Sequence, residues 1–309
     1  MGIPWNFHPD SETYINISNE VANAILNSGE FKDILNNGYY IIVYYLGSNI
    51  LTVTIYNIIL FSISNILIYA ALKKYTGITY FYWGLLLLLL NPYRMHLSTT
   101  CLKDTTIIFL SLLSVYSTKN FILALPALLI MRLSSIAYIV IIAIEGGNHR
   151  IKHFWLILLP CAFVMAGILI INADLLINWM NVNNEINMVF REFDSVPTFS
   201  EFGNFGIYIR AALWPLFYQT GLFFLLSPSI AYFPIFLGSL FNLIYCRIYQ
   251  NSWGLLLVPY LGLSAIALFV SGFTTYLRYA APILAILPIL IASQQAESCL
   301  NKKRLKTAL

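Results

Sequence analysis

The chain has 309 residues, of which 59% are hydrophobic and only 10% are charged, and its mean hydropathy is +0.76. Soluble domains usually carry about 25% charged residues, so this composition excludes soluble enzyme folds and favours a protein with several membrane-spanning segments. The formal net charge is only +4. Part of it sits in the carboxyl-terminal tail, which indicates a cytoplasmic anchor and not a nucleic-acid-binding surface.

The amino-terminal segment predicts an amphipathic helix outside the membrane. We expect Ser11 to be its N-cap and Gly29 to end it. Its apolar residues recur at helical spacing: Tyr14, Ile17, Val21 and Ile25. The helix is too polar to span a bilayer, so we expect it to lie along the interface or over a water-filled cavity. No basic region with a following apolar run marks a cleavable signal peptide.

Most of the later apolar runs are predicted to be membrane-spanning helices. The first full-length span is Ile50–Leu72, after the short aromatic run Gly38–Leu46, and the two lysines that follow this span place its end in the cytoplasm. Further spans are expected at Tyr80–Leu90, Thr105–Ser117, Phe121–Met131, Ser134–Ile144, His153–Ala173, Ser252–Val270 and Tyr276–Ile291.

The number of crossings follows from the two ends of the chain. An external start and a cytoplasmic basic tail require an odd number, so we expect Gly206–Tyr218 to be an interfacial helix with one span after it. The fold class is then all-α, a polytopic transmembrane bundle of about nine spans. Its first region is an external loop at 1–49, and this loop contains the candidate aspartate, the amphipathic helix and a short apolar run. The regions that follow are a first transmembrane region at 50–173, an external polar loop at 174–204, a second transmembrane region at 205–295 and the basic tail at 296–309.

On this topology, five basic residues from distant segments fall at external helix ends: Arg94, Lys103, Arg132, Arg210 and Arg278. Charges beside apolar segments are costly and usually face a cavity or a partner, so we expect these residues to bind an anionic substrate at the outer leaflet. Structural interpretations stay open. Arg94 and Lys103 can be snorkelling anchors, Arg210 can bind lipid headgroups, and Arg278 can anchor the last span.

Asp10 is the candidate catalytic residue. A carboxylate held near a cavity can take a proton from a sugar hydroxyl, although a carboxylate at a helix N-terminus is also favoured by the helix dipole alone. Glu12 is a competitor, and Asp104 can simply cap the helix that follows it. Possible supporting residues are His8, Glu12, Tyr14, His96, Asp104 and Tyr279.

The sequence predicts no dedicated metal or cofactor site. The histidines and the four cysteines lack ligand spacing, and no glycine-rich phosphate loop is present. A divalent metal held by Asp10 and Glu12 stays open as a lesser alternative.

Several short segments resemble a family of bacterial enzymes. They are Pro9–Tyr14, Gly38-Tyr39-Tyr40, Asn91-Pro92 through Cys101-Leu102-Lys103-Asp104, Met131-Arg132 and Arg278-Tyr279. Together they resemble GT-C-type membrane glycosyltransferases and, within this class, Wzy-like O-antigen or capsular polysaccharide polymerases. The resemblance covers most of the chain. These proteins usually have a transmembrane helix before the aspartate-containing loop, whereas this sequence starts at that loop.

The resemblance implies glycosyl transfer in lipopolysaccharide or capsule biosynthesis, on the periplasmic face of the inner membrane, from sugars carried on undecaprenyl pyrophosphate. Asp10 would be the base toward the acceptor hydroxyl, and the five basic residues would stabilise the departing lipid diphosphate. The implied partners are the undecaprenyl-linked oligosaccharide, the bilayer and a chain-length regulator or other assembly proteins.

Two alternatives stay open. One is a GT-C enzyme that adds a single branch sugar from a polyprenyl-phosphate donor, which product length would distinguish from a polymerase. The other is a lipid-linked oligosaccharide flippase or transporter. Such folds often carry internal repeats and polar groups deep in their spans, and neither is evident in this sequence.

Overall fold

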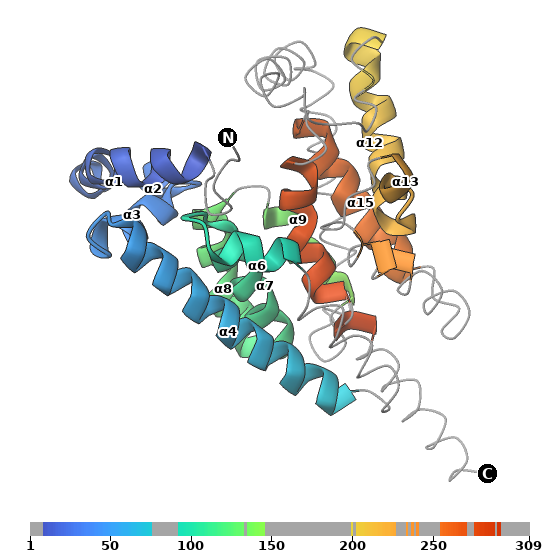
Figure 1. Cartoon of the computed structure of the whole chain (residues 1–309), viewed down its shortest axis with the longest axis horizontal. Coiled ribbons are helices and arrows are strands. Elements are labelled where there is room, and N and C mark those ends of the chain that lie inside the picture. The colour runs from blue at the N-terminus through green and yellow to red at the C-terminus, as the bar shows by residue number, and fades with distance from the viewer. Residues whose placement is uncertain are drawn as a thin grey trace. The chain divides into compact units, whose positions relative to one another are not determined.

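All the secondary structure in the described residues is helical (Figure 1), which confirms the all-α prediction for this part of the chain. The structure, a computed structural model, describes residues 9–75, 92–132, 135–145, 199, 202–226, 233, 236–237, 239–240, 254–270, 275–287 and 289–291. The chain divides into two compact units: residues Met1–Ile139 with Ala285–Leu309, and residues Val140–Leu284.

The first unit is built around α7. Its helices are α1 (Pro9–Ser28), α2 (Phe31–Ile34), α3 (Gly38–Tyr45), α4 (Ile50–Tyr75), α6 (Pro92–Ser98), α7 (Asp104–Tyr116), α8 (Thr118–Met131) and the first residues of α9 (Ile136–Glu145). Helix α7 packs against α4, α6 and α8, while α3 packs against both α1 and α8. Through α3, the amino-terminal helix is therefore connected to the helices that surround α7.

The start of α1 differs from the prediction, and its end confirms it. The helix begins at Pro9, so Ser11 lies inside the first turn. The prediction of Ser11 as N-cap is wrong, because its hydroxyl accepts a hydrogen bond from the distant main-chain N–H of Cys101 at 3.2 Å. Gly29 follows the last residue of the helix with φ +63°, a left-handed conformation that glycine adopts without strain.

The buried side of α1 is rotated from the predicted apolar stripe. Tyr14 is buried between the rings of Tyr39 and Tyr40, each with its centroid 5.0 Å away. Ile17, which the periodicity places on the buried side, is exposed, and Ser18 is buried in its stead. Its neighbour α3 sets this orientation, because the aromatic contact fixes which side of α1 faces inward.

Helix α4 exposes many large apolar side chains, although Val53 and Ile68 are buried. Among the described residues, it is the one helix long and apolar enough to cross a membrane, over Ile50–Ala71. Its exposed large side chains are Ile50, Leu51, Ile55, Ile58, Ile59, Ile63, Ile66 and Tyr69. The buried side includes the polar residues Asn57 and Ser64. A helix that faces water does not expose so many large apolar side chains.

Three of the shorter predicted spans are short helices in the structure. Helices α7, α8 and α9 match the predicted Thr105–Ser117, Phe121–Met131 and Ser134–Ile144 to within three residues at each end. Ser117 alone separates α7 from α8, and its hydroxyl caps α8 by accepting from the N–H of Asn120 at 3.1 Å. The predicted break at Arg132 is confirmed, because this residue is extended with φ −162° and ψ 125°.

The count of about nine spans stays a prediction. The predicted helices Tyr80–Leu90 and His153–Ala173, most of the external loop at 174–204 and the basic tail lie outside the described residues.

The second unit centres on the pairing of two helices. Helix α12 (Gly203–Thr220) packs along α15 (Gly254–Phe269), and the hydroxyl of Tyr260 donates to the carbonyl of Ala212 at 3.0 Å. Helix α12 ends at Gly221, which has φ +75°, and the short α13 (Phe223–Leu226) follows. Residues 275–284 form a further helical segment of this unit. Helix α12 contains the predicted interfacial helix Gly206–Tyr218.

Candidate functional site

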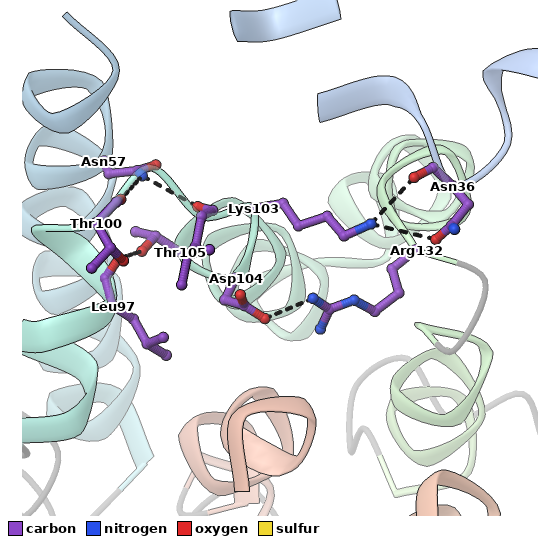
Figure 2. A network of polar contacts seen from close by, with 9 residues as sticks. Asn36, Asn57, Leu97, Thr100, Lys103, Asp104, Thr105 and Arg132 are labelled. Carbon is purple, nitrogen blue, oxygen red and sulfur yellow. Dashed lines mark hydrogen bonds and ion pairs between the residues drawn. The ribbon is translucent and has the colours of Figure 1, made fainter. Parts of the chain in front are cut away.

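Polar side chains gather where α6 turns into α7 (Figure 2). The turn is surrounded by α4, the end of α8 and the connection between α2 and α3. We call this group the α7 polar cluster and define it by five residues: Asn36, Asn57, Lys103, Asp104 and Arg132. It lies in the first unit, and its members come from four separate segments of the chain.

A buried ion pair joins the start of α7 to the end of α8. Nη2 of Arg132 lies 2.8 Å from Oδ1 of Asp104, and the two side chains are only 4% and 0% exposed. Asp104 is the first residue of α7, where the helix dipole favours a negative charge. Buried charges are costly unless they are paired. The pairing therefore requires the ends of α7 and α8 to stay side by side.

Lys103 is held by the connection between α2 and α3. Its Nζ donates to the main-chain carbonyl of Asn36 at 3.2 Å and to the side-chain oxygen of the same residue at 3.4 Å. Asn36 has φ +68°, a conformation that asparagine tolerates better than most residues. Lys103 and Arg132 thus lie at the same end of α7 (Figure 2).

Asn57 connects α4 to the turn. Its Nδ2 donates to the carbonyls of Thr100 at 2.7 Å and Leu102 at 3.2 Å, and it also lies 3.3 Å from the hydroxyl of Tyr39. The side chain of Asn57 is completely buried. Asn57 is not among the predicted site residues, although an asparagine inside an apolar span requires a polar partner.

Arg94 lies away from the α7 polar cluster. Its Nη2 donates to Oδ1 of Asn65 at 3.1 Å, and its guanidinium lies 5.2 Å from the ring centroid of Phe61. Asn65 is eight residues beyond Asn57, which corresponds to about 12 Å along the axis of α4. Burial lowers the pKa of Arg94 to about 10, so the guanidinium stays protonated at neutral pH. Both Arg94 and Lys103 are buried, so their interpretation as snorkelling anchors is wrong.

The start of α1 lies against the turn. Asp10 is the second residue of this helix, and the hydroxyl of the next residue, Ser11, accepts from the main chain of Cys101. The side chain of Asp10 and the whole of His8 lie outside the described residues. Glu12 is exposed.

The other supporting residues have separate positions. Tyr14 packs against α3, His96 is half-buried in the last turn of α6, and Asp104 pairs with Arg132. The interpretation of Asp104 as the capping residue of α7 is wrong, because Lys103 holds the N-cap position and Asp104 is the first helical residue, with its carboxylate against Arg132.

Arg210 stabilises the end of a helix in the second unit. Its Nε donates to the carbonyl of Ala267 at 2.9 Å, its Nη2 donates to that of Leu268 at 3.5 Å, and its guanidinium lies 5.3 Å from the ring centroid of Trp214. The last carbonyls of α15 accept no hydrogen bond from the main chain of this helix, and the helix dipole favours a cation at this end.

Arg278 is also buried, and its guanidinium lies 6.0 Å from the ring centroid of the half-buried Tyr279. Arg210 and Arg278 are therefore both buried. An aromatic group that the sequence pattern did not predict lies beside Arg210 and consists of Trp214, Tyr218 and Tyr276.

The cluster presents two cations beside one carboxylate, a set of groups suited to anion recognition and not to metal ligation. Within the described residues, no group of three or more histidine, cysteine, aspartate or glutamate side chains could hold a metal ion. Comparisons of the chain with protein-family models, with curated proteins and with solved structures found no match.

Proposed function

We propose that the chain is a membrane glycosyltransferase that polymerises oligosaccharide repeat units carried on undecaprenyl pyrophosphate, on the periplasmic face of the bacterial inner membrane. One observation carries the proposal: the α7 polar cluster holds Lys103 and Arg132 together, beside the helix start to which Asp10 belongs. A guanidinium offers a planar fork to a phosphate, and an ammonium offers a point charge, so together they suit a diphosphate.

The proposed reaction needs one base and an anion-stabilising group. The hydroxyl oxygen of the acceptor sugar attacks the anomeric carbon of the donor, and the bond from that carbon to the diphosphate oxygen breaks. Asp10 takes the hydroxyl proton, and the lipid diphosphate leaves with the electron pair. Lys103 and Arg132 stabilise the negative charge on this leaving group, an effect that is strong in a site with little water.

The exposed apolar side of α4 supports a membrane location. A helix with isoleucine and leucine outside and asparagine and serine inside is suited to contact with lipid. The 22 residues of its apolar stretch exceed the roughly 20 needed to cross a bilayer.

The three other basic residues enter the proposal with different support. Arg94 binds Asn65, which lies about 12 Å along α4 from Asn57, so Arg94 would meet a part of the substrate away from the diphosphate held by Lys103. Arg210 already binds the end of α15. Arg278 belongs to the second unit and stays a prediction from the sequence.

Transfer from a defined substrate tests the proposal. The purified protein in lipid nanodiscs is incubated with a synthetic undecaprenyl-pyrophosphate-linked repeat unit, and the products are analysed by mass spectrometry. We expect a ladder of repeat units and a decrease of about 10²–10⁴-fold in rate for Asp10→Asn, which removes the base. Glu12→Gln is the matched control, because Glu12 lies in the same helical turn and is exposed.

Other products would contradict the proposal in recognisable ways. Addition of one sugar would indicate the branching transferase, and movement of unchanged substrate across the bilayer would indicate the transporter. A ladder made equally fast by Asp10→Asn would remove the base role assigned to Asp10.

A further inference from the structure

Asn57 is a polar residue at a position where polar residues are costly. It lies on α4, the helix whose other side carries exposed isoleucine and leucine, and its own side chain is completely buried. A buried amide costs free energy unless its hydrogen bonds are made. The Nδ2 group of Asn57 makes its hydrogen bonds to segments outside α4.

One of these segments is the turn before Lys103. Residues 99–103 are not helical, and their carbonyls need donors from elsewhere once they are removed from water. Asn57 donates to two of them, those of Thr100 and Leu102. Leu102 directly precedes Lys103, and Asp104 follows at the start of α7.

The same amide also extends to the covering helices. Its Nδ2 lies 3.3 Å from the hydroxyl of Tyr39 on α3, and the ring of Tyr39 packs edge-on against Tyr14 of α1. One side chain therefore connects α4, the turn and the layer that carries the start of α1.

From these contacts we infer that Asn57 is the positioning residue of the proposed diphosphate site, fixing the α6–α7 turn against α4 and with it the places of Lys103 and Asp104. The assignment of a diphosphate to this site rests on the proposed function, whereas the fixing of the turn by Asn57 is independent of it. Figure 2 shows Asn57 on one side of the turn and Arg132 on the other, with Lys103 and Asp104 between them.

Substitution of Asn57 tests the inference, with Lys103 as the reporter. Asn57→Leu keeps the size of the side chain and removes both donors to the turn. Lys103 is buried, so reductive methylation of the folded protein, quantified by mass spectrometry, measures its exposure. We expect the methylation rate of Lys103 to rise about tenfold, as hydrogen bonds that oppose local opening are lost. Lys119, which is already exposed, serves as an internal reference in every sample.

Ser64→Ala is the matched control. Ser64 is buried on the same side of α4, and its hydroxyl donates to Leu60 of its own helix at 2.7 Å. We expect this variant to leave the methylation of Lys103 unchanged. If Asn57→Leu does not fold, Asn57→Ser, which keeps one donor on a shorter side chain, is expected to give an intermediate rise.

The kcat of the transfer reaction distinguishes a positioning role of Asn57 from a role in supporting the fold alone. A displaced Lys103 stabilises the leaving group less in the transition state, so we expect kcat to fall about tenfold with KM nearly unchanged. Asn57→Gln, which retains the amide, is expected to recover part of the rate. An unchanged methylation rate in Asn57→Leu overturns the fixing of the turn.

If Lys103 becomes exposed in Asn57→Leu while kcat stays at the wild-type value, the positioning role is overturned and Asn57 is a structural contact only. A wild-type protein that transfers no sugar contradicts the proposed function, while the methylation result still decides whether Asn57 fixes the turn.

Discussion

Arg132 and Arg210 are both buried, yet different kinds of group hold them. In the first unit, Arg132 faces the carboxylate of Asp104. In the second unit, Arg210 donates to main-chain carbonyls at the end of α15. The carboxylate belongs to one side chain that mutation can remove, whereas the carbonyls are present whenever α15 is folded.

The comparison shows that burial of an arginine does not by itself indicate a substrate site. Arg210 has a sufficient structural explanation in the stabilisation of a helix end. The Asp104–Arg132 pair joins the ends of α7 and α8, although replacing a buried ion pair by apolar residues is often neutral or stabilising. We therefore expect substitutions of the Asp104–Arg132 pair and of Arg210 to reduce the free energy of unfolding by different amounts. We also expect them to differ in whether a second substitution restores stability.

The largest effect is expected for Asp104→Leu. It leaves the charge of Arg132 buried without its carboxylate, which typically costs about 3–5 kcal/mol. Denaturant unfolding of the protein in detergent micelles, followed by circular dichroism, measures the free energy of unfolding. Asp104→Leu combined with Arg132→Met is expected to restore most of the loss. A double variant as unstable as the single one would contradict the assignment of the loss to the unpaired charge.

A smaller effect is expected for Arg210→Met. The variant loses hydrogen bonds to two carbonyls of α15 and the contact with the Trp214 ring, which together contribute about 1–3 kcal/mol. The same unfolding measurement applies. Arg210→Lys, which keeps the charge, is the matched control and is expected to lose less. A loss that equals that of Asp104→Leu would mean that Arg210 also has an essential charged partner.

The smallest effect is expected for Asn36→Gly. Lys103 donates to the main-chain carbonyl of residue 36 at the shorter of its two distances, so its contact resembles that of Arg210. Glycine keeps this carbonyl and adopts φ +68° without strain, so we expect the free energy of unfolding to change by less than about 0.5 kcal/mol. Asn36→Ala, which is strained at this φ, is expected to cost about 1 kcal/mol more. Equal stability of the two variants would contradict this account.

Local features of the fold could be predicted from the sequence. Hydropathy alone indicates α4, and glycine with φ > 0 explains why α1 ends before Gly29. The break at Arg132 follows from a charge between two apolar runs. These features depend on neighbouring residues, which the sequence displays directly.

Pairings between distant segments could not be predicted in this way. The partner of Asp104 depends on the antiparallel packing of α7 and α8, and the hydroxyl of Ser11 binds a turn that lies 90 residues later in the chain. Likewise, the contact of Arg210 with α15 joins residues 57 positions apart. Charge and hydropathy identified these side chains as unusual, but only the packing of the helices decides which groups they contact.

If α4 crosses the bilayer, as the proposed function requires, its length has a consequence for the choice of lipid. The 22 residues Ile50–Ala71 measure about 33 Å, a little more than the roughly 30 Å hydrocarbon core of an ordinary bilayer. A helix longer than the core tilts, and short-chain lipids increase the tilt. Because Asn57 lies on this helix, acyl-chain thickness would act on the geometry around Lys103 through a single amide.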